Sequence, residues 1–91
     1  MKIYQSNLFS KAVKKLKAKE KTILDEELKK IISNSVKGEE KKGDLFGVFV
    51  YKFKINATLF LLAYQFEDED LNLIMLAPYE NYYRNLKNFL R

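Results

Sequence analysis

Lysine, arginine, tyrosine and carboxylate side chains must carry any chemistry of this chain, because histidine and cysteine are both absent. Without cysteine there is neither a disulfide nor a thiolate metal site. Without histidine the chain lacks the commonest metal ligand and the commonest general base at neutral pH. These absences restrict the possible reactions more than any other feature of the composition.

Two lysines stand close together within an apolar stretch, at Lys52 and Lys54. The stretch spans residues 43–66, is rich in β-branched and aromatic residues, and is broken only at residues 56–58, which predicts a β-hairpin. Side chains alternate between the two faces of a strand, and neither face of the first strand is plainly polar before Lys52 and Lys54. We therefore expect helices to cover one face of the sheet and the other face to stay partly open for a ligand. One predicted face carries Phe46, Val48, Val50, Lys52 and Lys54, and the other carries Leu45, Gly47, Phe49, Tyr51, Phe53 and Ile55.

Positive charge is concentrated in the first half of the chain. The net charge is +5, but residues 1–42 contain twelve lysines and six acidic residues, and residues 43–91 contain five basic and six acidic residues. Such a surface fits a polyanion or an acidic protein, and charge does not choose between them. A solvated helix face explains many of these lysines equally well. The candidate lysines for binding a polyanion such as RNA are Lys11, Lys14, Lys15, Lys41 and Lys42.

Four consecutive carboxylates at residues 67–70 are the one group that suggests a metal. A calcium loop needs alternating ligands and a glycine at its sharp turn, and this segment has neither. We therefore expect an acidic turn between two strands, and neither a metal nor another cofactor.

The remaining pattern predicts a single α+β domain over residues 1–91, in the order β-α-α-β-β-β-α. We expect a helical hairpin packed on a mostly antiparallel sheet, with Ser6 capping the first helix and a capping box at Thr22 and Asp25 opening the second. The other expected elements are an edge strand at 2–5, a turn at 17–21, a loop at 33–43, a buried strand at 71–77 ended by Pro78, and a short helix within 79–91. No apolar run is long enough to span a membrane or to form a signal peptide, so we expect a cytoplasmic protein.

Three segments together resemble the RelE/ParE superfamily of toxins from bacterial type II toxin–antitoxin pairs. They are FSKAVKKLKAKEKTILDEELKKI, GEEKKGDLFGVFVYKFKINATLFLLAYQF and LAPYENYYRNLKNFL, and they cover nearly the whole chain in order. The KKGDL-x-GV strand entry and the EN-x-YR-x-LK ending are the most distinctive parts. The resemblance implies a RelE-like domain that is silenced by a cognate antitoxin wrapped around it.

The resemblance implies two kinds of target. RelE-like relatives enter the ribosomal A site and cleave the mRNA there, whereas ParE-like relatives poison DNA gyrase. The expected partners are therefore the antitoxin and mRNA on the ribosome, with no membrane, and with DNA contacted only through an antitoxin complex.

The family pattern matches only in part. It typically has arginine where this chain has Phe49, histidine where it has Tyr79, and a further arginine near Leu61. These departures leave open a catalytically weakened relative that mainly binds its antitoxin. The basic, acidic and phenolic residues that remain are Lys52, Lys54, Glu80, Tyr83 and Arg84.

Carried onto this chain, the resemblance implies a metal-independent endoribonuclease (mRNA interferase) that inhibits translation. Such cleavage needs a base, a cation for the phosphorane charge, and an acid for the leaving oxygen. Glu80 is the candidate base and Tyr83 or Tyr79 the candidate acid. The positive charge would come from Lys52, Lys54 and Arg84. Helix packing and solvated strand lysines are the competing explanations for these residues.

Overall fold

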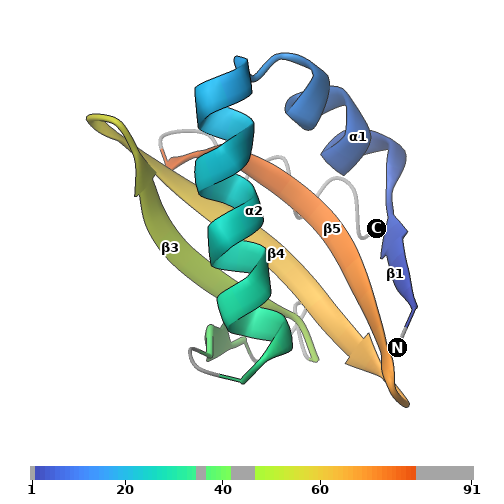
Figure 1. Ribbon diagram of the computed structural model, residues 1–91. Helices are drawn as coiled ribbons and strands as arrows, with labels where there is room; N and C mark the ends of the chain where they lie inside the picture. Colours follow the sequence, from blue (N-terminus) through green and yellow to red (C-terminus); the bar gives the residue numbers. More distant parts are fainter. Residues whose placement is uncertain (1, 35–36, 42–46, 80–91) are drawn as a thin grey trace.

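The computed structural model describes residues 2–34, 37–41 and 47–79. In this part of the chain two helices lie against one face of a sheet (Figure 1). The strands are β1 (Ile3–Gln5), β2 (Glu39–Glu40), β3 (Phe49–Ile55), β4 (Thr58–Glu67) and β5 (Asp70–Pro78), and the helices are α1 (Asn7–Lys14) and α2 (Ala18–Ile32).

The strands form one sheet in the order β1-β5-β4-β3-β2. Only β1 and β5 run parallel, and the other neighbours are antiparallel. This arrangement confirms the predicted α+β fold, with β1 at an edge and β5 inside the sheet. The final helix of the prediction falls mostly on residues 80–91, outside the described residues.

The short strand β2 was not expected, because residues 33–43 read as a loop. Its two glutamates pair with Val50 and Phe49 at the outer edge of β3. The exposed backbone of an edge strand offers hydrogen-bonding partners to any neighbouring extended segment, whatever its side chains. A polar sequence therefore forms a strand here without the apolar alternation that predicts one.

Two tight turns connect the long strands. Asn56 and Asp68 each open such a turn with a positive φ, 57° and 56° respectively. Asn and Asp adopt this left-handed conformation more readily than other non-glycine residues. The structure thus confirms both the hairpin interruption near residue 56 and the acidic turn at residues 67–70.

Apolar side chains are buried on both faces of the sheet. The face beneath the helices belongs to a cluster formed by Phe9, Leu24, Ile31, Phe53, Ile55, Leu62, Tyr64, Leu71, Leu73 and Leu76. The opposite face buries a smaller cluster of Val48, Val50, Leu61, Ala63, Ile74, Met75 and Ala77. Burial on both sides explains why the sequence of β3 shows no polar face before Lys52.

The first helix begins as predicted. The Ser6 hydroxyl accepts a hydrogen bond from the backbone N–H of Phe9 at 3.0 Å and donates one to the carbonyl of Ile74. Ile74 lies where the register between β4 and β5 shifts, next to the Ala63–Met75 pair. Ser6 therefore joins the start of α1 to an irregularity in the sheet.

The predicted start of the second helix is wrong. Instead of a turn through residue 21 and a cap at Thr22, α2 begins at Ala18. The Glu20 carboxylate accepts a hydrogen bond from the backbone N–H of Lys17 at 2.7 Å, while Thr22 bonds inside the helix to the carbonyl of Ala18. Alanine, lysine and glutamate are strong helix formers, so the helix extends into the segment read as a turn.

Candidate functional site

The alternation of β3 separates its lysines from its aromatic residues. Val48 and Val50 are buried on the face away from the helices, and Lys52 and Lys54 continue that face as exposed residues. Within the described residues neither lysine forms an ion pair. The predicted shared face is thus present, and its open part lies at the second half of β3.

Lys52 lies close to Tyr79. Its Nζ is 5.8 Å from the centre of the Tyr79 ring, within the range of a cation–π contact, and Tyr79 is half exposed. The sheet register explains the contact, because Lys52 pairs with Leu61 and Leu61 with Ala77 in one row across three strands. Tyr79 follows Ala77 by two residues and so reaches the same face. Two of the predicted site residues are therefore brought together.

Several predicted site residues fall outside the described part of the chain. These are Glu80, Tyr83 and Arg84 of the proposed catalytic set and Lys42 of the proposed RNA-binding set. Their roles stay predictions. Within the described residues, the candidate surface consists of Lys52, Lys54 and Tyr79.

The remaining RNA-binding candidates occupy two separate places. Lys11 and Lys14 lie in the last turn of α1 and Lys15 caps it, and all three are exposed. Lys41 instead forms an ion pair with Glu39 at 3.5 Å, beside β2. Figure 1 shows the α1–α2 connection at one end of α2 and the segment 37–41 at the other. The structure does not join these lysines into one patch.

Phe49 lies on the opposite side of the sheet from the lysines. Its ring stacks on that of Tyr64 with centroids 5.5 Å apart, and Nζ of Lys37 lies 5.3 Å from its centre. Phe49, which stands where the resemblance led us to expect an arginine, therefore packs on the helical side. Leu61, at the other position noted above, is completely buried.

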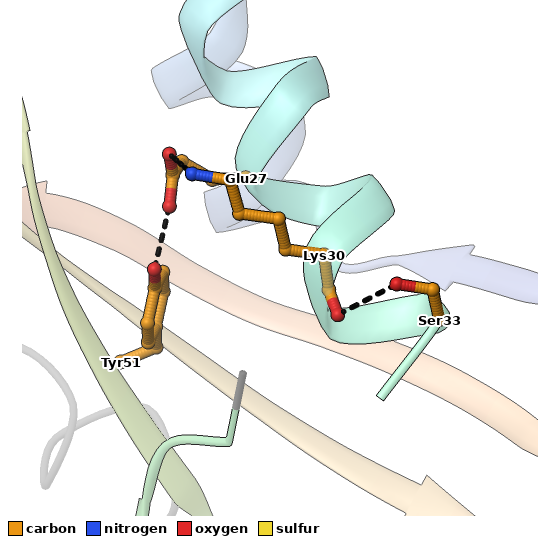
Figure 2. A network of polar contacts seen from close by, with 4 residues as sticks. All are labelled: Glu27, Lys30, Ser33 and Tyr51. Carbon is orange, nitrogen blue, oxygen red and sulfur yellow. Dashed lines mark hydrogen bonds and ion pairs between the residues drawn. The ribbon is translucent and has the colours of Figure 1, made fainter. Parts of the chain in front are cut away.

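A polar contact that the sequence did not suggest joins α2 to β3 (Figure 2). The Tyr51 hydroxyl donates to Oε1 of Glu27 at 2.5 Å, and Lys30 contacts Oε2 of the same carboxylate at 2.9 Å. Burial and the Glu27 carboxylate raise the pKa of Tyr51 to about 12. Burial alone would raise the pKa of Glu27, but the hydrogen bonds from Tyr51 and Lys30 outweigh it and lower that pKa.

The acidic turn has structural partners. The Glu67 carboxylate accepts a hydrogen bond from the Asn72 amide at 3.3 Å, and the Asp70 carboxylate accepts one from the backbone of Lys2 at 3.0 Å. Among the described residues no group of three or more acidic side chains is arranged to hold a metal ion. None of the helices in the same ranges is long and apolar enough to cross a membrane.

What the site offers chemically is a cation beside a phenol, with a second lysine two residues along the same strand face. Such a surface can stabilise a phosphate and stack on, or donate a proton to, a bound group.

Comparison of the sequence with known protein families defines the class of protein. Residues 3–87 match the family model described as the ParE-like toxin of type II bacterial toxin-antitoxin system. The chain belongs to this family, which confirms the resemblance to the RelE/ParE superfamily. A toxin of this type has an antitoxin as its partner.

The fold also has a solved counterpart. The solution structure of the conserved hypothetical protein HP0894 from Helicobacter pylori is similar, with a TM-score of 0.53 and 17% sequence identity. The similarity covers 87% of this chain and 94% of that chain, and at this identity it supports the fold alone. No curated protein sequence matches this chain.

Proposed function

We propose that this toxin is a metal-independent endoribonuclease that cleaves mRNA in the ribosomal A site and so inhibits translation. The observation that carries the proposal is the approach of Lys52 to Tyr79 on the exposed part of the sheet face away from the helices. Lysine is suited to the charge that develops on a phosphate during 2′-hydroxyl attack, and a phenol is suited to proton donation or base stacking.

The other roles follow from the family resemblance. Glu80 would act as the base, Tyr83 or Tyr79 as the acid, and Arg84 would add positive charge to that of Lys52 and Lys54. Lys11, Lys14 and Lys15 would contact the nucleic-acid backbone through exposed charge. Lys41 and Lys42 would contribute from the segment before β3.

The test is to sequence mRNA ends after brief induction of the full chain. Wild type should leave mRNA cut at codon positions, and a K52A/R84A double variant should cut much less. K29A is the matched control, because Lys29 is an exposed α2 lysine away from the proposed surface. Intact mRNA and normal translation on wild-type induction would exclude the proposal.

The description of the matched family as ParE-like favours a second candidate, inhibition of DNA gyrase by binding without chemistry. In that case induction should produce gyrase-linked DNA breaks and an SOS response while cellular RNA stays intact. Cut mRNA without DNA damage would exclude it.

A further inference from the structure

In the described part of the chain, the second half of β3 has a paired strand on one side only. Within the described residues β2 pairs with Phe49 and Val50, so residues 51–55 are paired with β4 alone. This is the half of β3 that presents Lys52 and Lys54. A strand segment that is paired on one side, as this one is within the described residues, is less constrained than a segment paired on both sides. Any further contact to this segment therefore affects the position of Lys52 and Lys54.

The helix α2 makes further contacts to this half of β3. Leu24 packs in the same cluster as Phe53 and Ile55, but apolar contacts are non-directional and tolerate small displacements. The hydrogen bond from Tyr51 to Glu27 is directional and fixes the distance between α2 and β3 at one point (Figure 2). Lys30 holds the other carboxylate oxygen, and the Glu27 side chain is only 15% exposed. Glu27 is thus a well-anchored acceptor.

Tyr51 and Lys52 are neighbours in the chain and project to opposite faces of the strand. Tyr51 joins the helical face, and Lys52 reaches Tyr79 on the other. We infer that Tyr51 and Glu27 are positioning residues for Lys52, holding the second half of β3 in place so that the Lys52 ammonium group stays over the Tyr79 ring. The inference rests on the role proposed above for Lys52, although its first test needs no activity.

That test follows the Lys52 side chain by NMR of the full chain. The ring current of Tyr79 should shift the ε-methylene resonance of Lys52, and a Y79L variant supplies the reference position without a ring. Y51F removes the hydroxyl but keeps the ring that stacks on Phe53 at 5.9 Å. In Y51F the resonance should move toward the Y79L position. E27Q keeps a side-chain oxygen that can accept from the Tyr51 hydroxyl but removes the charge, so it should move the Lys52 resonance by less.

The control is Y4F, which removes the hydroxyl of a half-exposed tyrosine on β1, at the far edge of the sheet. It should leave the Lys52 resonance in place. An unmoved resonance in folded Y51F, or an equal movement in Y4F, would overturn the inference. If Y51F does not fold, E27Q is the test variant: a Lys52 resonance that moves toward the Y79L position supports the inference, and an unmoved resonance overturns it.

Activity provides the second measurement. If the chain cleaves RNA, Y51F should lower the maximal cleavage rate, by up to about 10²-fold for a displacement near 1 Å, with little change in KM. An unchanged rate would overturn the inference. If wild type does not cleave RNA while Y51F still moves the Lys52 resonance, the positioning role stands and the proposed endoribonuclease function fails.

Discussion

The hydroxyl of Tyr51 lies 2.5 Å from Oε1 of Glu27, joining a strand to a helix that are far apart in the sequence. Each partner changes the proton affinity of the other, since the carboxylate favours the protonated phenol and the phenol favours the ionised carboxylate. The contact therefore makes the free energy of unfolding depend on pH twice, at alkaline pH through Tyr51 and at acidic pH through Glu27.

At alkaline pH the chain should lose stability through Tyr51. Its pKa is raised from 10.0 to about 12, so the folded state holds the phenol proton more tightly than the unfolded state. The resulting contribution is complete below about pH 10 and is lost as the pH rises through about 12. Urea unfolding at a series of pH values should show a shallower alkaline loss for Y51F. An identical loss in wild type and Y51F would contradict this assignment.

At acidic pH the relevant group is Glu27. Because its pKa is lowered from 4.5 in the folded state, its contribution is present above the unfolded value and is lost as the pH falls through the folded one. E27Q should remove this part of the acid dependence. E26Q, at a neighbouring exposed position of α2, should retain it. Equal acid profiles for the two variants would show that Glu27 makes no special contribution.

Truncating Leu24 should destabilise the chain more than truncating Leu28 on the same helix. Leu24 is 2% exposed within the main core, whereas Leu28 packs at its margin and is only partly buried. Leu24→Ala should cost about 2–5 kcal/mol and Leu28→Ala less, because the second site is partly hydrated already. Equilibrium unfolding in urea measures both. A larger cost at Leu28 would mean that α2 packs with a different face.

A side chain at Gly38 should destabilise the fold. A Cβ there would lie 2.8 Å from the carbonyl oxygen of Val50, and the Gly38 N–H donates to the Tyr64 hydroxyl at 2.8 Å. We expect Gly38→Ala to cost about 1–3 kcal/mol through backbone displacement.

Gly47→Ala is the comparison for Gly38→Ala. A Cβ at residue 47 would meet nothing closer than the Gln65 amide nitrogen at 3.7 Å, but the Gly47 φ of +82° strains any L side chain. The expected cost is about 1–2 kcal/mol. Urea unfolding measures both costs, and the NMR resonances of the Tyr64 ring should shift only in Gly38→Ala. A neutral Gly38→Ala would contradict the close approach to Val50.

Ser6→Ala should weaken the start of α1. It removes the acceptor for the Phe9 N–H and the donor to the Ile74 carbonyl, so a cost of about 0.5–2 kcal/mol is expected. The control is Ser10→Ala, which removes only an exposed contact with Gln5. Amide hydrogen exchange at Phe9 should accelerate in the first variant alone. Unchanged protection at Phe9 would show that the cap contributes little.

Features set by a few neighbouring residues were predictable from the sequence. The Ser6 cap, the Asn56 turn and the acidic turn each depend on the chemistry of a short segment, and the structure confirms all three. The two faces of β3 were predictable as well, because strand alternation is a local geometric rule. The α+β fold follows from the order of these elements.

The start of α2 and the strand β2 show where local reasoning fails. Thr22 and Asp25 fit a capping box, but Glu20 accepts the Lys17 N–H five residues earlier and the helix begins at Ala18. The strand β2 exists because Glu39 and Glu40 pair with Val50 and Phe49 of β3. This pairing joins residues about ten positions apart in the chain, so the sequence around residues 39–40 does not indicate a strand.

The sequence by itself determined the family, the order of the described helices and strands apart from β2, and the shared face of Lys52 and Lys54. Only the tertiary structure decided that Lys52 meets Tyr79 and that Tyr51 meets Glu27. Both contacts depend on how separate elements align, the first on the register of three strands and the second on the docking of α2. Register and docking are set by the packing of the whole core rather than by the residues that meet.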